Sequence, residues 1–268
     1  MKIVAEIGLA HDGSLGNALA FVDACANAGV DAVKFQCHSG DPVSKFRQGT
    51  HFPQDDTRQD YWQRTDFLID QWQQIKNQCK SRGIEFGLSV FSELAVRTLN
   101  CHSFYPDFWK LGSGVSSSQE IIKAIGSHDV VASFGMSSRL ESAIGLVYYD
   151  PKRTTVLSCV SEYPCPPEHC GVDALDAINL RIKGYSIGIS DHSGTIWPSI
   201  VAASERADMA EVHVCWNRQC FGADVAASIT IDELKQLVEG VRFVERMKPV
   251  DKDKMAEELK PMREIFCQ

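Results

Sequence analysis

Residues 15–36 read LGNALAFVDACANAGVDAVKFQ, and this stretch places a helix pattern directly before a strand pattern. Apolar residues recur at helical spacing from Leu15 to Ala28, and Ala32–Gln36 is a short apolar run typical of a buried strand. A similar run, Ile3–Ile7, precedes the helix pattern. A strand, a helix and a second strand in this order predict parallel pairing of the two strands.

The same alternation continues along the chain and gives eight strand–helix units. The expected strands are 3–7, 32–36, 85–89, 108–111, 130–133, 154–160, 185–190 and 209–214, and the expected helices are 15–28, 61–82, 93–99, 119–125, 140–149, 172–182, 198–206 and 231–246. Eight such units predict a (β/α)8 TIM barrel of the α/β class over residues 1–246, followed by a charged tail, 247–268. An open doubly wound sheet is the alternative, which the lack of a G-x-G-x-x-G after the first strand disfavours.

Composition excludes several classes of partner. The net charge is −8, which argues against nucleic acid or an anionic membrane surface, because both need a basic footprint. The N-terminus enters a strand without a signal-peptide pattern, and no apolar run reaches the length of a membrane helix. The ten cysteines form no C-x-x-C pair, so neither a zinc ribbon nor a thioredoxin-like site is indicated. We expect a cytoplasmic protein.

Two lysines, Lys34 and Lys110, fall in the strands whose carboxyl ends would form the active face of a barrel. Two ammonium groups in one barrel mouth repel each other and need anionic partners. Those partners would be anionic groups of a substrate, or the barrel carboxylates Glu6 and Glu211 alone. The first alternative predicts a site for a phosphorylated acid, with the backbone of residues 112–114 in a phosphate cradle.

His192 and His213 are the candidate metal ligands. They lie near the carboxyl ends of neighbouring strands, where neutral imidazoles suit a divalent ion. A hydrogen-bonded structural pair of histidines is the competing interpretation, and the residues alone leave both open.

Several short motifs together resemble the sialic acid (N-acetylneuraminate) synthase family, which includes the legionaminic and pseudaminic acid synthases. The motifs are AEIG at 5–8 with His11 and Gly13, AGVDAVKFQ at 28–36, KLGSG at 110–114, SFGM at 133–136, CVSEYP at 159–164, GISDH at 188–192, EVH at 211–213, and Gly222 with Asp224 and Ser228. Their order and spacing from residue 3 to residue 246 carry the resemblance.

The resemblance implies that phosphoenolpyruvate and an N-acetylmannosamine-like aldehyde condense to a nine-carbon 2-keto sugar acid, in a homodimer that uses Mn²⁺ or Mg²⁺. The implied metal ligands are His192 and His213, and the implied catalytic residues are Glu6, Lys34, Lys110 and His192. The implied substrate-binding residues are Gln36, Ser89, Ser113, Ser133, Ser161, Tyr163, Ser190, Asp191, Glu211 and Asp224, of which Gln36, Tyr163 and Asp224 would line the sugar side.

The chain departs from the family pattern at several positions. Ala10 replaces an asparagine, Phe134 replaces a threonine near the expected pocket, Val160 replaces another threonine, and LSVFS at 88–92 replaces S-T-P-F-D. Residues 261–266 resemble the linker to an antifreeze-like domain. We expect this chain to lack that domain and therefore to bind the sugar more weakly than relatives that have it. Two other functions stay open: another barrel aldolase or 3-deoxy-sugar acid synthase, and a barrel without catalysis that binds a sugar acid or a partner protein.

Overall fold

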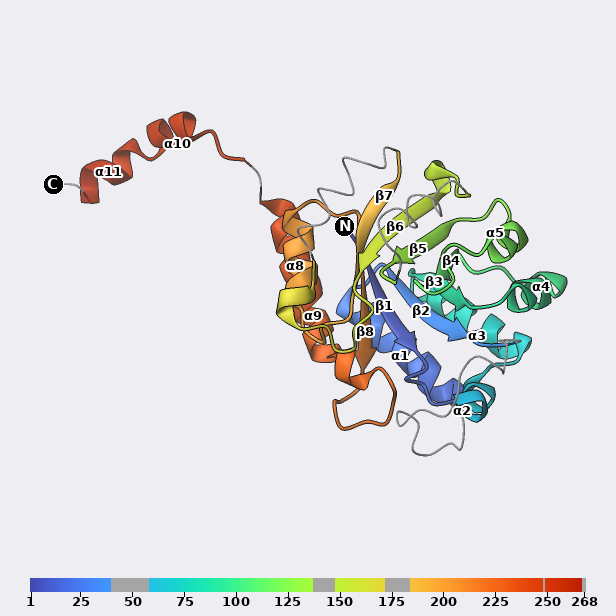
Figure 1. The fold of residues 1–268 in the computed structure, drawn as a ribbon. Helices are drawn as coiled ribbons and strands as arrows, with labels where there is room; N and C mark the ends of the chain where they lie inside the picture. Colours follow the sequence, from blue (N-terminus) through green and yellow to red (C-terminus); the bar gives the residue numbers. More distant parts are fainter. Residues whose placement is uncertain (40–57, 137–147, 172–183, 248, 267–268) are drawn as a thin grey trace.

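The computed structural model describes residues 1–39, 58–136, 148–171, 184–247 and 249–266. Its main feature is a closed barrel of parallel strands (Figure 1). The strands are β1 (Lys2–Gly8), β2 (Ala32–Cys37), β3 (Glu85–Val90), β4 (Phe108–Leu111), β5 (Val130–Phe134), β6 (Thr154–Cys159), β7 (Ser186–Asp191) and β8 (Met209–Cys215). Each pairs with the next, and β1 also pairs with β8, which closes the barrel. The (β/α)8 prediction is confirmed.

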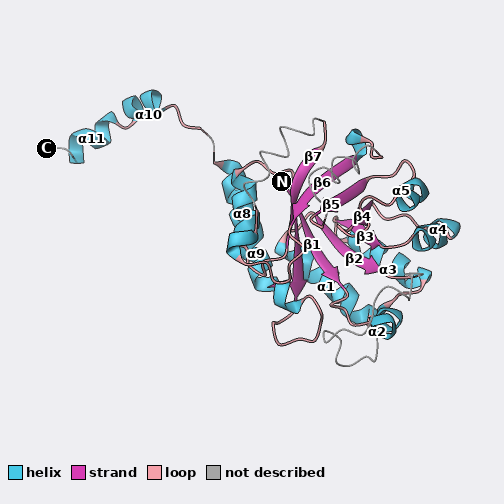
Figure 2. Cartoon of the chain, viewed as in Figure 1, coloured by secondary structure: helices cyan, strands magenta, loops and turns pink. Residues whose placement is uncertain are grey.

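Helices cover the outside of the barrel (Figure 2). They are α1 (Leu15–Ala28), α2 (Arg58–Thr65), α3 (Ile69–Ser81), α4 (Glu93–Cys101), α5 (Gln119–Ile125), α8 (Trp197–Ser204) and α9 (Ile231–Arg246). The expected helices at 140–149 and 172–182 fall almost wholly outside the described residues. A two-residue strand, β9 (Ile229–Thr230), pairs with β8 and was not predicted. The tail forms two exposed helices, α10 (Lys252–Glu258) and α11 (Lys260–Phe266), which extend away from the barrel.

The single helix predicted over 61–82 is wrong, because the structure has two helices, α2 and α3, with a break between them. Phe67 in the break is buried, and its ring stacks on His11 with centroids 4.5 Å apart. Leu68 then adopts an extended backbone as the N-cap of α3, and its N–H donates to Oε1 of Gln71 at 2.9 Å. Burial of Phe67 and this capping contact outweigh the helical periodicity of the segment.

The barrel interior is layered. Six buried apolar residues from six strands form one cluster: Val4, Ala32, Phe108, Val131, Leu157 and Met209. Because side chains on one face of a strand recur every two residues, the next inward positions lie one layer closer to the carboxyl ends. Those positions hold Glu6, Lys34, Lys110, Ser133, Cys159 and Glu211. An apolar layer therefore forms the floor beneath a polar one.

Candidate active site

The polar layer surrounds a cavity of about 90 Å³ at the carboxyl ends of the strands. Strand register sets the neighbours within it, since Glu6 pairs with Lys34 between β1 and β2, and Ser190 pairs with Glu211 between β7 and β8. The residues lining the cavity are Glu6, Lys34, Gln36, Ser89, Phe91, Lys110, Gly112, Ser113, Ser133, Cys159, Tyr163, Ser190, His192, Glu211 and His213. Most of the residues predicted from the sequence thus meet in one place.

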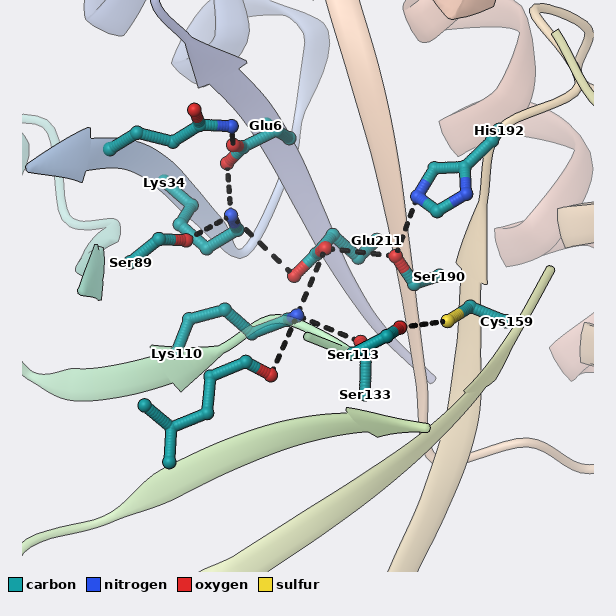
Figure 3. Close-up of polar contacts among 12 residues, drawn as sticks. Glu6, Lys34, Ser89, Lys110, Ser113, Ser133, Cys159, Ser190, His192 and Glu211 are labelled. Atoms are coloured by element: carbon teal, nitrogen blue, oxygen red, sulfur yellow. Dashed lines mark hydrogen bonds and ion pairs between the residues drawn. The ribbon is translucent and has the colours of Figure 1, made fainter. Parts of the chain in front are cut away.

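The two lysines share one carboxylate. Nζ of Lys34 lies 2.5 Å from Oε2 of Glu6 and 4.0 Å from Oε2 of Glu211. Nζ of Lys110 lies 3.6 Å from Oε1 of Glu211, and Figure 3 shows Glu211 between the two ammonium groups. The structure therefore contains the ion pairs with Glu6 and Glu211 that would compensate the lysines without a substrate. The two lysines also lie close enough together to bind one anionic substrate.

Serine hydroxyls complete the surroundings of the lysines. Lys34 donates to Oγ of Ser89 at 2.6 Å, and Lys110 donates to Oγ of Ser133 at 2.7 Å. Ser190 donates to Oε1 of Glu211 at 3.0 Å. These hydroxyls belong to neighbouring strands and hold the charged groups in fixed positions (Figure 3).

Burial and charge act against each other at Lys110 and Glu211. Burial lowers the pKa of Lys110, Glu211 raises it, Lys34 lowers it further, and the net direction is down. Burial raises the pKa of Glu211, but Lys110 and Lys34 outweigh that effect and hold the pKa below its usual range. Oε2 of Glu211 has no hydrogen-bond donor among the described residues. The site therefore holds an ionised, incompletely satisfied carboxylate against two ammonium groups.

On the β6 side, Ser113 connects two further side chains. Its Oγ is 2.9 Å from Sγ of Cys159 and accepts a hydrogen bond from Ser161 at 3.3 Å. Cys159 also lines the cavity. Burial raises the pKa of its thiol, although the hydrogen bond with Ser113 opposes the shift. A raised pKa favours the thiol over the reactive thiolate.

His192 presents an unprotonated nitrogen to the cavity. Its Nδ1 lies 2.7 Å from the carbonyl oxygen of Val160, which can only accept, so Nδ1 carries the proton. Burial and the nearby His213 lower the pKa of His192 to about 4, which keeps the ring neutral. Tyr163 stacks on this ring, with centroids 4.1 Å apart, and its hydroxyl lies 3.0 Å from Nε2. The Nε2 lone pair is therefore available to a hydrogen-bond donor or a metal ion.

His213 and Asp224 extend the site on the β8 side. The rings of His192 and His213 have centroids 5.6 Å apart, and Nδ1 of His213 lies 3.9 Å from Oδ2 of Asp224. Ala10, His213 and Asp224 line a smaller cavity of about 10 Å³. The described residues contain no group of three or more His, Cys, Asp or Glu side chains that could hold a metal ion. The donor set fits an exchangeable ion with water in its other positions rather than a closed structural site.

Two predicted neighbours of the pocket point elsewhere. Asp191 accepts hydrogen bonds from the backbone N–H of Ser193 at 2.8 Å and from Ser199 at 3.2 Å, and it does not line the cavity. Phe134 packs against the outer core, with its ring 6.5 Å from that of Tyr149. Both follow an inward-facing serine on the same strand, and alternation turns them outward. Asp191 thus lies outside the lining of the 90 Å³ cavity, as do Ser161 and Asp224.

Sequence reasoning missed two aromatic residues at the cavity rim. Phe91 lines the cavity, and the ring of His38 stacks on it with centroids 4.3 Å apart. Both lie just after the ends of their strands, β3 and β2, where backbone direction is not set by strand alternation. The one sequence signal for a place at the cavity rim was that each residue directly follows the end of a strand.

Comparison with known proteins identifies the family. The NeuB family model matches residues 21–252. The chain belongs to the NeuB family. This NeuB family chain is 29% identical to the N-acetylneuraminate-9-phosphate synthase of Mus musculus, over 91% of the chain and 70% of the relative. It is 27% identical to the spore coat polysaccharide biosynthesis protein SpsE of Bacillus subtilis, over 91% of the chain and 67% of the relative.

A solved structure shows the same fold. The N-acetylneuraminic acid (sialic acid) synthetase of Leptospira borgpetersenii, crystallised with citrate, superposes with a TM-score of 0.79. The match covers 99% of this chain and 92% of that chain, at 22% sequence identity. The family predicted from the motifs is thus confirmed, and the chain is a member of a family of sugar acid synthases. Among the described residues, no helix has the length and apolarity needed to span a membrane.

Proposed function

We propose that this chain condenses phosphoenolpyruvate with an N-acylated hexosamine aldehyde, similar to N-acetylmannosamine, to give a nine-carbon 2-keto sugar acid and phosphate. The observation that carries the proposal is the convergence of Lys34 and Lys110 with two imidazoles, His192 and His213, around one cavity. A phosphorylated carboxylic acid would satisfy both ammonium groups, and the imidazoles suit the carbonyl partner beside it.

The lysines and serines would bind phosphoenolpyruvate. Lys34 and Lys110 are held by Ser89 and Ser133, so their positions are fixed before the ligand arrives. Ser113, Ser161 and Ser190 add hydroxyl donors to the same surroundings. Fixed donors lower the ordering cost of binding an anion.

Glu6 would be the acid/base of the reaction. One of its oxygens faces Lys34 and the other accepts from Nε2 of Gln36 at 2.7 Å, so the carboxylate is oriented from two sides. It would manage the proton of the water that adds to the enol-phosphate carbon. Gln36, Tyr163 and Asp224 would line the sugar. The carbon–carbon bond forms between phosphoenolpyruvate and the aldehyde carbon, and phosphate leaves.

His192 and His213 would hold a divalent ion, Mn²⁺ or Mg²⁺. Such an ion would polarise the sugar aldehyde as a Lewis acid. The fit rests on the unprotonated Nε2 of His192 and on the proximity of the two rings. The hydroxyl of Tyr163 occupies that lone pair in this structure and would have to turn away on ion binding.

A phosphate-release assay tests the proposal. The protein is incubated with phosphoenolpyruvate, Mn²⁺ or Mg²⁺, and a panel of aldehydes, with reactions lacking the sugar or the metal as controls. The panel includes N-acetylmannosamine, its 6-phosphate, and a pentose phosphate without an acylated amine. Release only with N-acylated hexosamines supports the proposal. Release only with the pentose phosphate would assign a 3-deoxy-sugar acid synthase instead.

An aldolase that forms a Schiff base is the second candidate, since burial lowers the pKa of Lys110 as such a lysine requires. The surroundings of Lys110 disfavour it, because Ser133 and Glu211 make the site polar rather than apolar. Borohydride trapping with pyruvate, followed by mass spectrometry, separates the two. A pyruvyl adduct on Lys110 would replace our proposal with the aldolase.

A further inference from the structure

A stacked histidine outside the predicted site contacts Gln36. The ring of His38 lies between those of Trp62 and Phe91, with centroid distances of 4.3 Å on both sides and interplanar angles of 4° and 6°. His38 is buried. Parallel rings on both faces prevent tilting of the imidazole, so only its edge can make hydrogen bonds.

The edge of His38 faces the amide of Gln36. Nε2 of His38 lies 3.1 Å from Oε1 of Gln36, and Nε2 of the same amide donates to Oε1 of Glu6 at 2.7 Å. The other oxygen of Glu6 faces Lys34. These contacts form a continuous series from the aromatic stack at the rim to the carboxylate in the polar layer.

The direction of each hydrogen bond follows from chemistry. A carboxylate oxygen can only accept, so the amide must turn its nitrogen towards Glu6 and its oxygen towards His38. His38 must then carry its proton on Nε2 to donate to that oxygen. One orientation of the amide and one tautomer of the ring satisfy the whole series.

The backbone at Gly8 leaves room for this arrangement. A Cβ atom at Gly8 would lie 3.2 Å from Nε2 of Gln36 and 3.3 Å from Oε1 of Glu6. The φ angle of Gly8 is +55°, a conformation that favours glycine. A side chain here would crowd the contact between the amide and the carboxylate.

We propose that His38 is a positioning residue, which fixes the amide of Gln36 and through it the carboxylate of Glu6 for acid/base work. The role of Glu6 in this inference rests on the proposed function. The series of contacts from His38 to Glu6 rests on the structure alone. Within the described part of the chain, His38 is connected to Glu6 through Gln36.

The kinetic test uses His38→Phe, which keeps a ring between Trp62 and Phe91 and removes the N–H donor. We expect kcat to fall about tenfold, the effect of one lost orienting hydrogen bond, while the KM for phosphoenolpyruvate changes by less than about twofold. In a double-variant cycle, Gln36→Leu with His38→Phe should be no slower than Gln36→Leu alone. Multiplicative losses would overturn the proposal, because His38 would then act independently of Gln36.

His128→Phe is the matched control. His128 also stacks on an aromatic ring, that of Tyr105 at 4.9 Å, and lies at the opposite end of the barrel, just before β5. The His128→Phe variant should retain the kcat of the parent protein. If His38→Phe and His128→Phe have equal kcat values and only their melting temperatures change, His38 is a packing residue and the proposal fails.

A second measurement does not depend on activity. Two-bond ¹H–¹⁵N spectra of histidine-labelled protein, with His38 assigned by its absence in His38→Phe, should show the Nε2–H tautomer. Gln36→Leu removes the acceptor and should shift the Nε2 resonance. An Nδ1–H tautomer would overturn the series of contacts. A protein that releases no phosphate yet shows the expected tautomer would refute the proposed function and keep the inferred contact series.

Discussion

Oε1 of Glu211 lies 3.6 Å from Nζ of Lys110, and both residues are buried inside the barrel. The same carboxylate also lies 4.0 Å from Lys34. An ion pair in such surroundings must offset the cost of desolvating both groups, and here one carboxylate is shared by two cations. Lys34 also pairs with Glu6, so among the described residues Lys110 is the cation whose charge is balanced by the shared carboxylate alone, and an added anion would be attracted to it. This relationship links stability to ligand binding.

Glu211→Gln should lower the free energy of unfolding by about 3–5 kcal/mol, because removing one partner leaves buried charge without compensation. Phosphate or phosphoenolpyruvate would then supply the missing negative charge. The melting temperature of the variant should consequently rise more with added ligand than that of the parent protein. Differential scanning fluorimetry over a ligand titration measures both effects.

Glu93→Gln is the control for this prediction. Glu93 pairs with the exposed Arg97 on α4, a pair expected to contribute about 0.5 kcal/mol or less. The rise in melting temperature of Glu93→Gln on ligand addition should equal that of the parent protein. Equal shifts in Glu211→Gln and Glu93→Gln would show that the anion does not bind beside Glu211.

Lys110→Met should weaken phosphoenolpyruvate binding by at least about thirtyfold, since truncating one partner of a buried charge pair costs about 2–5 kcal/mol. Isothermal titration calorimetry gives the dissociation constant directly. Lys152→Met, at an exposed position at the opposite end of the barrel, changes the net charge by the same amount. If both variants bind alike, the loss reflects the overall charge and not a contact with Lys110.

Much of the site could be predicted because strand alternation is visible in the sequence. Once the eight strands are located, the inward positions after the apolar layer follow by counting in twos, and this identifies Glu6, Lys34, Lys110 and Glu211. The same alternation turns Asp191 away from the cavity, because it directly follows the inward-facing Ser190.

The parts of the site and fold that could not be predicted depend on contacts between segments far apart in the sequence. The sandwich of Trp62, His38 and Phe91 joins α2 to the ends of two strands, and no spacing along the chain predicts it. The break between α2 and α3 likewise arises from the burial of Phe67 against His11. Periodicity describes one element at a time, so it misses interactions that form only on packing.

His192→Ala or His213→Ala should weaken Mn²⁺ binding by about a hundredfold or more, if both imidazoles hold the proposed ion. Electron paramagnetic resonance of free Mn²⁺ gives the affinity without any need for turnover. The exposed His169, which pairs with Glu162, provides the control variant His169→Ala. Unchanged affinity in His213→Ala would exclude the two-histidine site.

The buried His11 should make the protein sensitive to acid. Burial lowers the pKa of His11 to about 3, from a usual value of about 6.5. Between these two values the unfolded chain binds a proton at this position and the folded chain does not. Stability contributed by neutral His11 is therefore present above about pH 6.5 and is lost progressively as the pH falls towards about 3.

His11→Phe removes this proton linkage and keeps a ring against Phe67. Urea unfolding at pH values between 7 and 4 should show a shallower loss of stability in the variant, by up to about 1.4 kcal/mol per pH unit within the window. His169→Phe is the matched control, because Glu162 raises the pKa of His169 and shifts the linkage in the opposite direction. An equally shallow slope in both variants, or an unchanged slope in His11→Phe, would mean that His11 binds its proton in the folded protein as readily as in the unfolded chain.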